Sequence, residues 1–149
     1  QLTMTTADLM LKADQLTPLA PDTPLDAVIG TLTRGAVGSA WVEDLKQPGH
    51  LLGLITDGDL RRALRDQPSS QWPTLTAANL MTTDPITTTL DVLAVDALKA
   101  MEHNRRKPIS VLPVVNAAGE LEGLLRLLQL QPDPVRRTSI AVQLARPWR

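Results

Sequence analysis

The chain has 149 residues, of which 43% are hydrophobic and 21% charged, and its net charge is −1 at pH 7. These values fit a globular chain of one ordinary domain or two small ones, and they give no sign of nucleic acid or membrane as a partner. The absence of cysteine excludes disulfides, thiol catalysis and thiolate metal sites, and it fits a reducing compartment such as the cytoplasm. No apolar run approaches the roughly 20 residues of a membrane span, and no signal-peptide pattern opens the sequence.

The sequence contains one pattern twice. The segment TADLM at 6–10 returns as TAANLM at 76–81, and LLGLIT at 51–56 returns as LEGLLR at 121–126. Between them, GSAWVED at 38–44 corresponds to SVLPVVN at 110–116. This period is too long for a solenoid, so two copies indicate a pseudo-symmetric pair of units.

The first copy predicts a short helix, an extended piece, a helix, two strands and a final helix. In chain order these elements are expected at 5–13, near 16–19, from 23 to about 35, at 39–43 and 51–55, and from Asp57 to before Pro68. The connection between the two strands contains Pro and Gly, as a hairpin turn does. The segment 67–73, rich in Pro, Ser and Gln, reads as a linker.

The second copy predicts the same order. Its elements are expected at 76–81, 86–88, from Asp91 through LAVDALKAM, at 111–115 and at 121–125. Pro132 and Pro134 leave its last helix short or missing, and the segment 132–149 is a docking tail or a linker. The predicted fold class is therefore α+β, with two β-α-β-β-α units at 1–67 and 76–131, a linker at 68–75 and a tail at 132–149.

The segment GLITDGDLRRAL at 53–64 carries the clearest chemical signal. A strand that delivers Thr56 to a helix N-terminus places a hydroxyl beside free N–H groups and the positive end of the helix dipole, which suits a phosphate. The ionised Asp59 offers two acceptor oxygens, which suit the two vicinal hydroxyls of a ribose. The same residues also form an ordinary helix cap, and between the two aspartates we expect Asp57 to be the cap and Asp59 the ligand residue.

These features resemble the CBS domain pair, a family named from cystathionine β-synthase. The resemblance covers about residues 5–131 and rests on the tandem unit, on Thr56-Asp57-Gly58-Asp59, on LPVV at 112–115 and on LMTTDPITT at 80–88. It implies two units related by an approximate twofold axis, and a homodimer. It also implies that Thr56 and Asp59 hold the phosphate and ribose of a nucleotide, with the base near Thr17, Gly38, Ser39 and Ala40.

The phrase TDGDLRR is similar to the CBS pair of sugar-phosphate isomerases of the D-arabinose-5-phosphate isomerase type, where it follows a sugar isomerase (SIS) catalytic domain. It is also similar to CBS pairs of sugar-phosphate nucleotidyltransferases. The resemblance therefore implies a covalently linked SIS domain in the parent protein, which these residues do not contain. It further implies an adenine nucleotide, AMP or ATP, or a CMP-sugar type of ligand, and no required cofactor.

The second copy departs from the ligand pattern. Arg126 and Gln129 stand at the positions of Thr56 and Asp59, and Gln129 offers no charged acceptor to a ribose. The first site is therefore the expected one. Arg61, Arg62 and Arg65 read as the solvated face of a helix, with anion contact or an intersubunit salt bridge as the alternative, and the basic stretch 103–108 reads as a solvated loop. His50 and His103 are isolated, so no metal site is expected.

No nucleophile elbow, P-loop, Rossmann fingerprint or metal-ligand cluster occurs in the sequence, so we expect no catalysis by these residues alone. Two hypotheses remain. The first is a regulatory module that binds an adenine nucleotide or a sugar nucleotide through Thr56, Asp57 and Asp59. The second is a ligand-free module that fixes the dimeric state of its parent enzyme.

Overall fold

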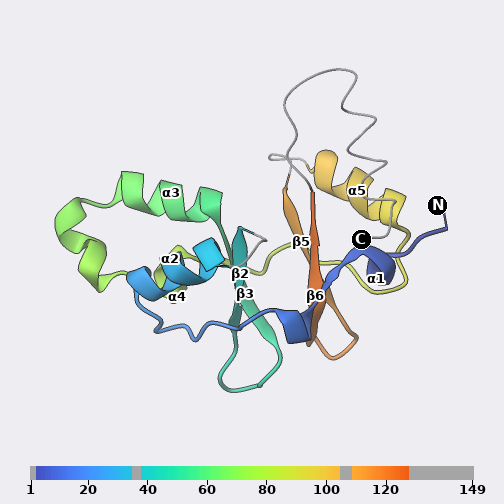
Figure 1. Cartoon of the computed structure of the whole chain (residues 1–149), viewed down its shortest axis with the longest axis horizontal. Helices are drawn as coiled ribbons and strands as arrows, with labels where there is room; N and C mark the ends of the chain where they lie inside the picture. The colour runs from blue at the N-terminus through green and yellow to red at the C-terminus, as the bar shows by residue number, and fades with distance from the viewer. Residues whose placement is uncertain (1–2, 35–37, 105–108, 128–149) are drawn as a thin grey trace. The chain divides into compact units, whose positions relative to one another are not determined.

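The computed structural model describes residues 3–34, 38–104 and 109–127, and Figure 1 shows the order of the elements. The helices are α1 (Thr6–Leu9), η1 (Ala13–Gln15), α2 (Leu25–Arg34), α3 (Asp57–Asp66), η2 (Ser69–Thr74), α4 (Ala77–Leu80) and α5 (Ala94–Glu102), where η marks a 3₁₀ helix. The strands are β1 (Leu11–Lys12), β2 (Ser39–Glu43), β3 (Leu51–Thr56), β4 (Thr82–Thr83), β5 (Val111–Val115) and β6 (Leu121–Arg126). The described strands form two three-stranded sheets, β2-β3-β4 and β1-β6-β5, so the expected α+β class with two small sheets is confirmed.

Each sheet takes its shortest strand from the other sequence repeat. β4 belongs to the second repeat and pairs with β3, where Thr82 lies opposite Leu54. β1 belongs to the first repeat and pairs with β6, where Leu11 lies opposite Leu124. The chain accordingly forms two compact units, the β3 unit, with residues 13–85 and 117–121, and the β6 unit, with the described residues of 1–12, 86–116 and 122–149.

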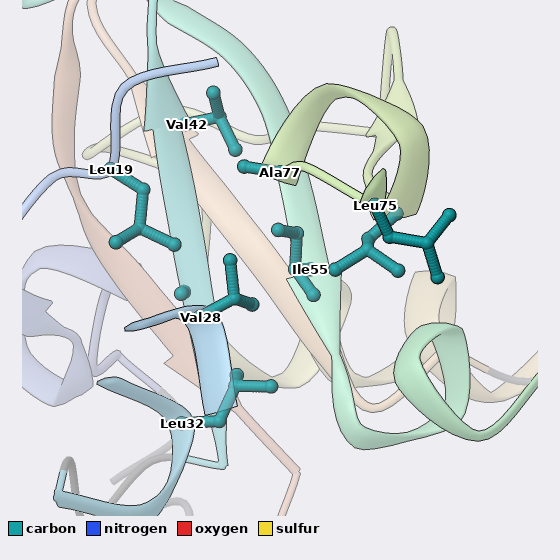
Figure 2. Packing of buried hydrophobic residues seen from close by; sticks show 9 residues of the cluster. Leu19, Val28, Leu32, Val42, Ile55, Leu75 and Ala77 are labelled. Atoms are coloured by element: carbon teal, nitrogen blue, oxygen red, sulfur yellow. The ribbon is translucent and has the colours of Figure 1, made fainter. Parts of the chain in front are cut away.

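The core of the β3 unit lies on one face of the β2–β3 hairpin, as Figure 2 shows. Ala40 and Val42 alternate along β2 toward this face, and Ile55 joins them from β3, because successive side chains of a strand point to opposite faces. Val28 and Leu32, one turn apart on α2, pack over them. The buried cluster is completed by Leu19, Leu75, Ala77 and Leu80.

The β6 unit has a second core of the same kind. Leu112 and Val114 alternate along β5, and α5 covers them with Ala97 and Met101. Leu9 from α1 is also part of this core. The N–H of Thr6 in α1 donates to the carbonyl of Val92 at 2.7 Å, which fixes the N-terminal segment to the second repeat.

The strand predictions are confirmed at 39–43, 51–55, 111–115 and 121–125, with β3 and β6 each one residue longer. The extended pieces expected near 16–19 and 86–88 appear as parallel bridges, Leu19 with Val42 and Thr88 with Val114. The predicted domain boundaries and the twofold relation between the repeats stay predictions.

Some predicted helices are wrong in extent. The helix expected over 5–13 ends at Leu9, because Met10 turns to an extended conformation and Leu11 enters a sheet. The helix expected from Asp91 begins at Ala94, and the Asp91 carboxylate instead accepts a hydrogen bond from the Thr89 hydroxyl at 2.7 Å. Residues 69–74 of the expected linker form η2, and Trp72 packs against the core of the β3 unit. Gly35 and the tail 132–149 lie outside the described residues.

The repeated glycines mark places where another segment lies very close. A Cβ added at Gly53 in β3 would lie 2.5 Å from the Sδ atom of Met81. A Cβ added at Gly123 in β6 would overlap the carbonyl oxygen of Leu11 and lie 2.8 Å from Met10 Sδ. Glycine is therefore needed at position 123 for β1 to reach β6, whereas at position 53 a larger residue requires the Met81 side chain to shift.

Within the described residues, no helix combines the length and the apolar character that crossing a membrane requires.

Candidate ligand-binding site

The turn from β3 into α3 brings several predicted site residues together at one edge of the β3 unit. In the antiparallel pairing of β2 and β3, Ser39 lies directly opposite Thr56. The next residue, Asp57, begins α3. Because Ala40 and Ile55 point into the core, Ser39 and Thr56 lie on the other face of the hairpin.

Gly38 allows the chain to pass close to Asp57. Its φ of +65° lies in the left-handed region that favours glycine. A Cβ added there would lie 3.1 Å from Asp57 Oδ2, so the two residues are neighbours at the start of β2. The carboxylate of Asp57 thus lies on the side of Gly38 where a side chain would otherwise stand.

Ser39 presents a buried hydroxyl that none of the described residues satisfies. The residue is only 5% exposed, and its Oγ atom has no hydrogen-bond partner among the described residues. The Nε1 atom of Trp41, two residues further along β2 on the same face, is also buried without a hydrogen-bond partner among the described residues. Burying such groups without partners costs free energy, and most buried polar atoms in proteins avoid it. Ser39 therefore offers a hydrogen bond to a group outside the described chain.

The N-cap of α3 is Thr56, so the expected cap at Asp57 is wrong. The N–H of Asp59 donates to Thr56 Oγ1 at 3.2 Å, and the N–H of Thr56 donates to Asp59 Oδ2 at 2.9 Å. This reciprocal pair is a capping box, which needs its carboxylate at the third helical position. Asp57 occupies the first helical position instead, beside Gly38.

The second carboxylate oxygen of Asp59 is also engaged. Arg62 Nη2 donates to Asp59 Oδ1 at 2.6 Å, and the Thr82 hydroxyl donates to the same oxygen at 3.2 Å. Arg62 follows from its i+3 spacing on the helix, which the sequence displays. Thr82 reaches Asp59 only because β4 pairs with β3, and no local signal in the sequence reveals that pairing.

Two predicted base-side residues fit the site less directly. The Ala40 side chain is 4% exposed within the core, so only its backbone is available to a ligand. Thr17 is exposed and lies two residues before Leu19, which bridges to Val42 in β2. The residues that gather at the strand-to-helix turn are thus Gly38, Ser39, Thr56, Asp57 and Asp59.

The remaining charged candidates have distinct surroundings. Arg62 forms an ion pair within its own helix, an arrangement that neither of the sequence alternatives for it included. Arg65 donates to Asp66 at 3.0 Å, and this hydrogen bond, followed by the charge attraction, lowers the pKa of Asp66 and raises that of Arg65.

In the second repeat, Arg126 ends β6, whereas Gln129 and residues 105–108 of the basic stretch lie outside the described residues. In the part of the chain that the structure describes, no three His, Asp or Glu side chains group as metal ligands would.

Proteins of known sequence and structure share this architecture. Arabinose 5-phosphate isomerase KpsF from Escherichia coli is 38% identical over 119 residues, which are 77% of this chain and 34% of the relative. Arabinose 5-phosphate isomerase KdsD from Pseudomonas aeruginosa is 34% identical over 131 residues, which are 87% of this chain and 38% of that protein. The chain thus spans about a third of the length of these curated relatives.

Among solved structures, the Arabidopsis thaliana CBS-pair protein CBSX2 in complex with AMP matches with a TM-score of 0.69 and 25% identity. The match covers 96% of this chain and 99% of that one. The family model of the CBS domain matches twice, at residues 7–66 and 77–130. The chain therefore belongs to the CBS domain family and carries two copies of the domain in tandem.

Proposed function

We propose that this CBS pair is the regulatory module of a sugar-phosphate isomerase of the arabinose-5-phosphate type, and that it binds a ribonucleoside phosphate at the turn between β3 and α3. The ligand is an adenine nucleotide or a sugar nucleotide of the CMP-sugar type. The module has no catalytic role of its own and acts on a covalently linked SIS domain.

The buried hydroxyl of Ser39 is the observation that carries this proposal. It lies opposite Thr56, next to Gly38 and at the start of α3. The first N–H groups of a helix have no partners within the helix, and they carry the positive end of its dipole. A phosphate at this point has as donors the first N–H groups of α3 that the capping box does not use, and Ser39 lies on the neighbouring strand. The Thr56 hydroxyl donates to Asp59 Oδ2 at 3.1 Å and must turn away from it to donate to the phosphate.

The relatives support the choice of parent enzyme and ligand class. KpsF and KdsD are named as arabinose 5-phosphate isomerases, which favours an isomerase parent over a nucleotidyltransferase. CBSX2 was solved with AMP. AMP is therefore the first probe, followed by ATP and a CMP-linked sugar.

A second candidate function is that of a ligand-free dimerisation module. It is favoured by Asp59, whose two carboxylate oxygens already accept hydrogen bonds from the protein itself. Ile29 on α2 and Leu93 before α5 are each 38% exposed, which leaves apolar surface for a second copy of the chain. A constant dimer with no saturable ligand would fit this function.

The experiment is calorimetric titration of the chain with AMP, ATP and a CMP-linked sugar, using Asp59→Asn as the test variant. Asparagine keeps the helix cap, because Asn79 already performs this role for α4 by accepting from the Thr76 N–H at 2.9 Å. The substitution removes the charge and replaces Oδ1 by an NH₂ donor, so we expect a ribonucleoside phosphate to bind about 10- to 150-fold more weakly, the equivalent of a charge-assisted hydrogen bond.

The matched control is Asp8→Asn. Asp8 accepts from the Thr5 N–H at 2.8 Å in a capping box of the same kind at α1. This control should leave the affinity unchanged. Saturable binding that Asp59→Asn weakens and Asp8→Asn does not would support the regulatory module, whereas no binding at millimolar ligand would favour the dimerisation module.

A further inference from the structure

The carboxylate of Asp59 has no free acceptor position in this structure. A carboxylate offers about four lone-pair sites. Oδ2 accepts from the N–H and the hydroxyl of Thr56, at 2.9 and 3.1 Å, and Oδ1 accepts from Arg62 and Thr82, at 2.6 and 3.2 Å. A ribose hydroxyl can reach Asp59 only by replacing one of these four donors.

The two oxygens differ in how firmly their donors are fixed. The Oδ2 donors belong to Thr56, the N-cap of α3, so replacing them opens the start of the helix. The Oδ1 donors are the side chains of Arg62 and Thr82, which can rotate without disturbing the backbone. The ligand must therefore compete for Oδ1.

The other capping boxes show that the Oδ1 contacts are not needed for the cap. In the box at α1, the side chain of Asp8 bonds only Thr5 among the described residues. In the box at α4, the Asn79 oxygen accepts only from Thr76 within the same part of the chain. Both helices therefore begin with a capping box in which the Asp8 or Asn79 side chain bonds only the N-cap residue among the described residues.

The surroundings of the Arg62 side chain allow it to move away from Asp59. Its side chain is 43% exposed, whereas that of Asp59 is only 10% exposed. Asp59, Arg62 and Thr82 all line an open groove of about 670 Å³ along α3, in which a displaced guanidinium finds space and water.

We propose that Arg62 is a specificity-determining residue of the ribonucleoside site, because it competes with the ribose hydroxyls for Asp59 Oδ1. This inference rests on the proposed function. Arg62 thereby raises the ligand concentration at which the module responds. Since the competition concerns only the vicinal hydroxyls, its effect is confined to ligands that carry them.

The test is calorimetric titration of the wild type and of Arg62→Met with AMP and with 2′,3′-dideoxy-AMP. Methionine keeps an unbranched side chain of good helix propensity and removes every donor. We expect Arg62→Met to bind AMP about 3- to 10-fold more tightly, the range of a partly exposed ion pair with one nearly buried partner. The affinity for 2′,3′-dideoxy-AMP should not change.

Two further variants separate local from general effects. Arg61→Met removes the neighbouring exposed arginine and should leave both affinities unchanged. Thr82→Val removes the weaker Oδ1 donor and should tighten AMP binding by a smaller factor. Thermal unfolding of each variant checks that the chain is folded.

The outcomes distinguish this inference from the function on which it rests. If the wild type binds AMP and Arg62→Met binds it equally or more weakly, the competition is disproved and the nucleotide site stands. If both ligands bind Arg62→Met more tightly by the same factor, Arg62 acts through general electrostatics and the inference is again wrong. If neither protein binds a ribonucleoside phosphate, the proposed function fails and the inference fails with it.

Discussion

The two repeats contain corresponding strands, but different residues stand at the ends of these strands. β2 begins with Ser39 and β3 ends with Thr56, whereas β5 begins with Val111 and β6 ends with Arg126. Ser39 and Val111 are nearly equally buried, at 5% and 6% exposure. The hydroxyl of Ser39 has no partner among the described residues, and Val111 has no polar side-chain atom to satisfy.

The comparison separates what the fold requires from what it tolerates. Since valine begins the equivalent strand in the second repeat, the fold does not require a hydroxyl there. An unsatisfied buried hydroxyl costs stability, so the hydroxyl of Ser39 supports the proposal of a ligand in the first repeat. The proposed site accordingly belongs to the first repeat.

The largest effect is expected on the free energy of unfolding, for substitutions of Gly53 and Gly123, the glycines that the two repeats share. In Gly123→Ala the new Cβ meets the backbone carbonyl of Leu11, which cannot move without breaking the β1–β6 pairing. We expect a loss of about 2–3 kcal/mol in the free energy of unfolding, measured by urea denaturation.

The matched variant is Gly53→Ala, where the new Cβ meets the side chain of Met81. This side chain has several rotatable bonds and can shift, so the expected loss is about 1 kcal/mol. Equal losses in the two variants would contradict the distinction between a backbone and a side-chain obstacle.

A smaller effect, of opposite sign for stability and binding, is expected for Ser39→Ala. Removing an unsatisfied hydroxyl should leave the free energy of unfolding unchanged or raise it slightly. It should weaken binding of a ribonucleoside phosphate by about 2- to 12-fold, the equivalent of a neutral hydrogen bond, in a calorimetric titration.

Val111→Ala is the control in the other repeat. It removes buried apolar atoms and should lower the free energy of unfolding by about 1–3 kcal/mol, while the affinity stays unchanged. If Ser39→Ala instead destabilised the chain and left binding intact, the hydroxyl would have a structural partner and the site would lose its main support.

The smallest expected effect is on the pKa of Asp91, which lies in the loop before α5 of the second repeat. The hydrogen bond from Thr89 is the main cause that lowers the pKa of Asp91 below 3.8. A lowered pKa in the folded state contributes stability above the unfolded value, and this contribution is lost as the pH falls through the folded pKa. NMR titration of the Asp91 carboxyl should show the lowered pKa, and Thr89→Val should return it toward 3.8; an unchanged value in that variant would disprove the assignment.

Local sequence signals predicted the elements of this fold well. The strands at 39–43, 51–55, 111–115 and 121–125 are apolar runs with glycine-containing turns, and all four lie where expected. The exchange of β1 and β4 between the repeats could not be predicted, because two-residue strands carry no periodicity. The positions of Gly53 and Gly123 were visible as a repeat, but the reason for them lies in the segments that pack on them.

The sequence predicts which residues meet at the strand-to-helix turn better than it predicts their contacts. The order of strand, threonine and helix correctly placed Thr56 and Asp57 at one turn, and the register of β2 against β3 brought Ser39 to it. The cap was assigned to Asp57, because a sequence does not show which residue stands just outside a helix. The internal partners of Asp59 depend on Thr82, which is distant in sequence, and on Arg62, whose charge alone did not distinguish it from Arg61.

The exchange of short segments sets an order for assembly during synthesis. All helices and strands of the β3 unit have been made once Thr83 has left the ribosome, whereas β1 must wait for β6, which pairs Leu11 with Leu124. Pairings between such distant residues form late, because they close long loops. We therefore expect α1 of the nascent chain to remain without its docking partner until the second repeat is made, so that a chain whose synthesis stops before β6 would expose Leu9 and Met10 to chaperones.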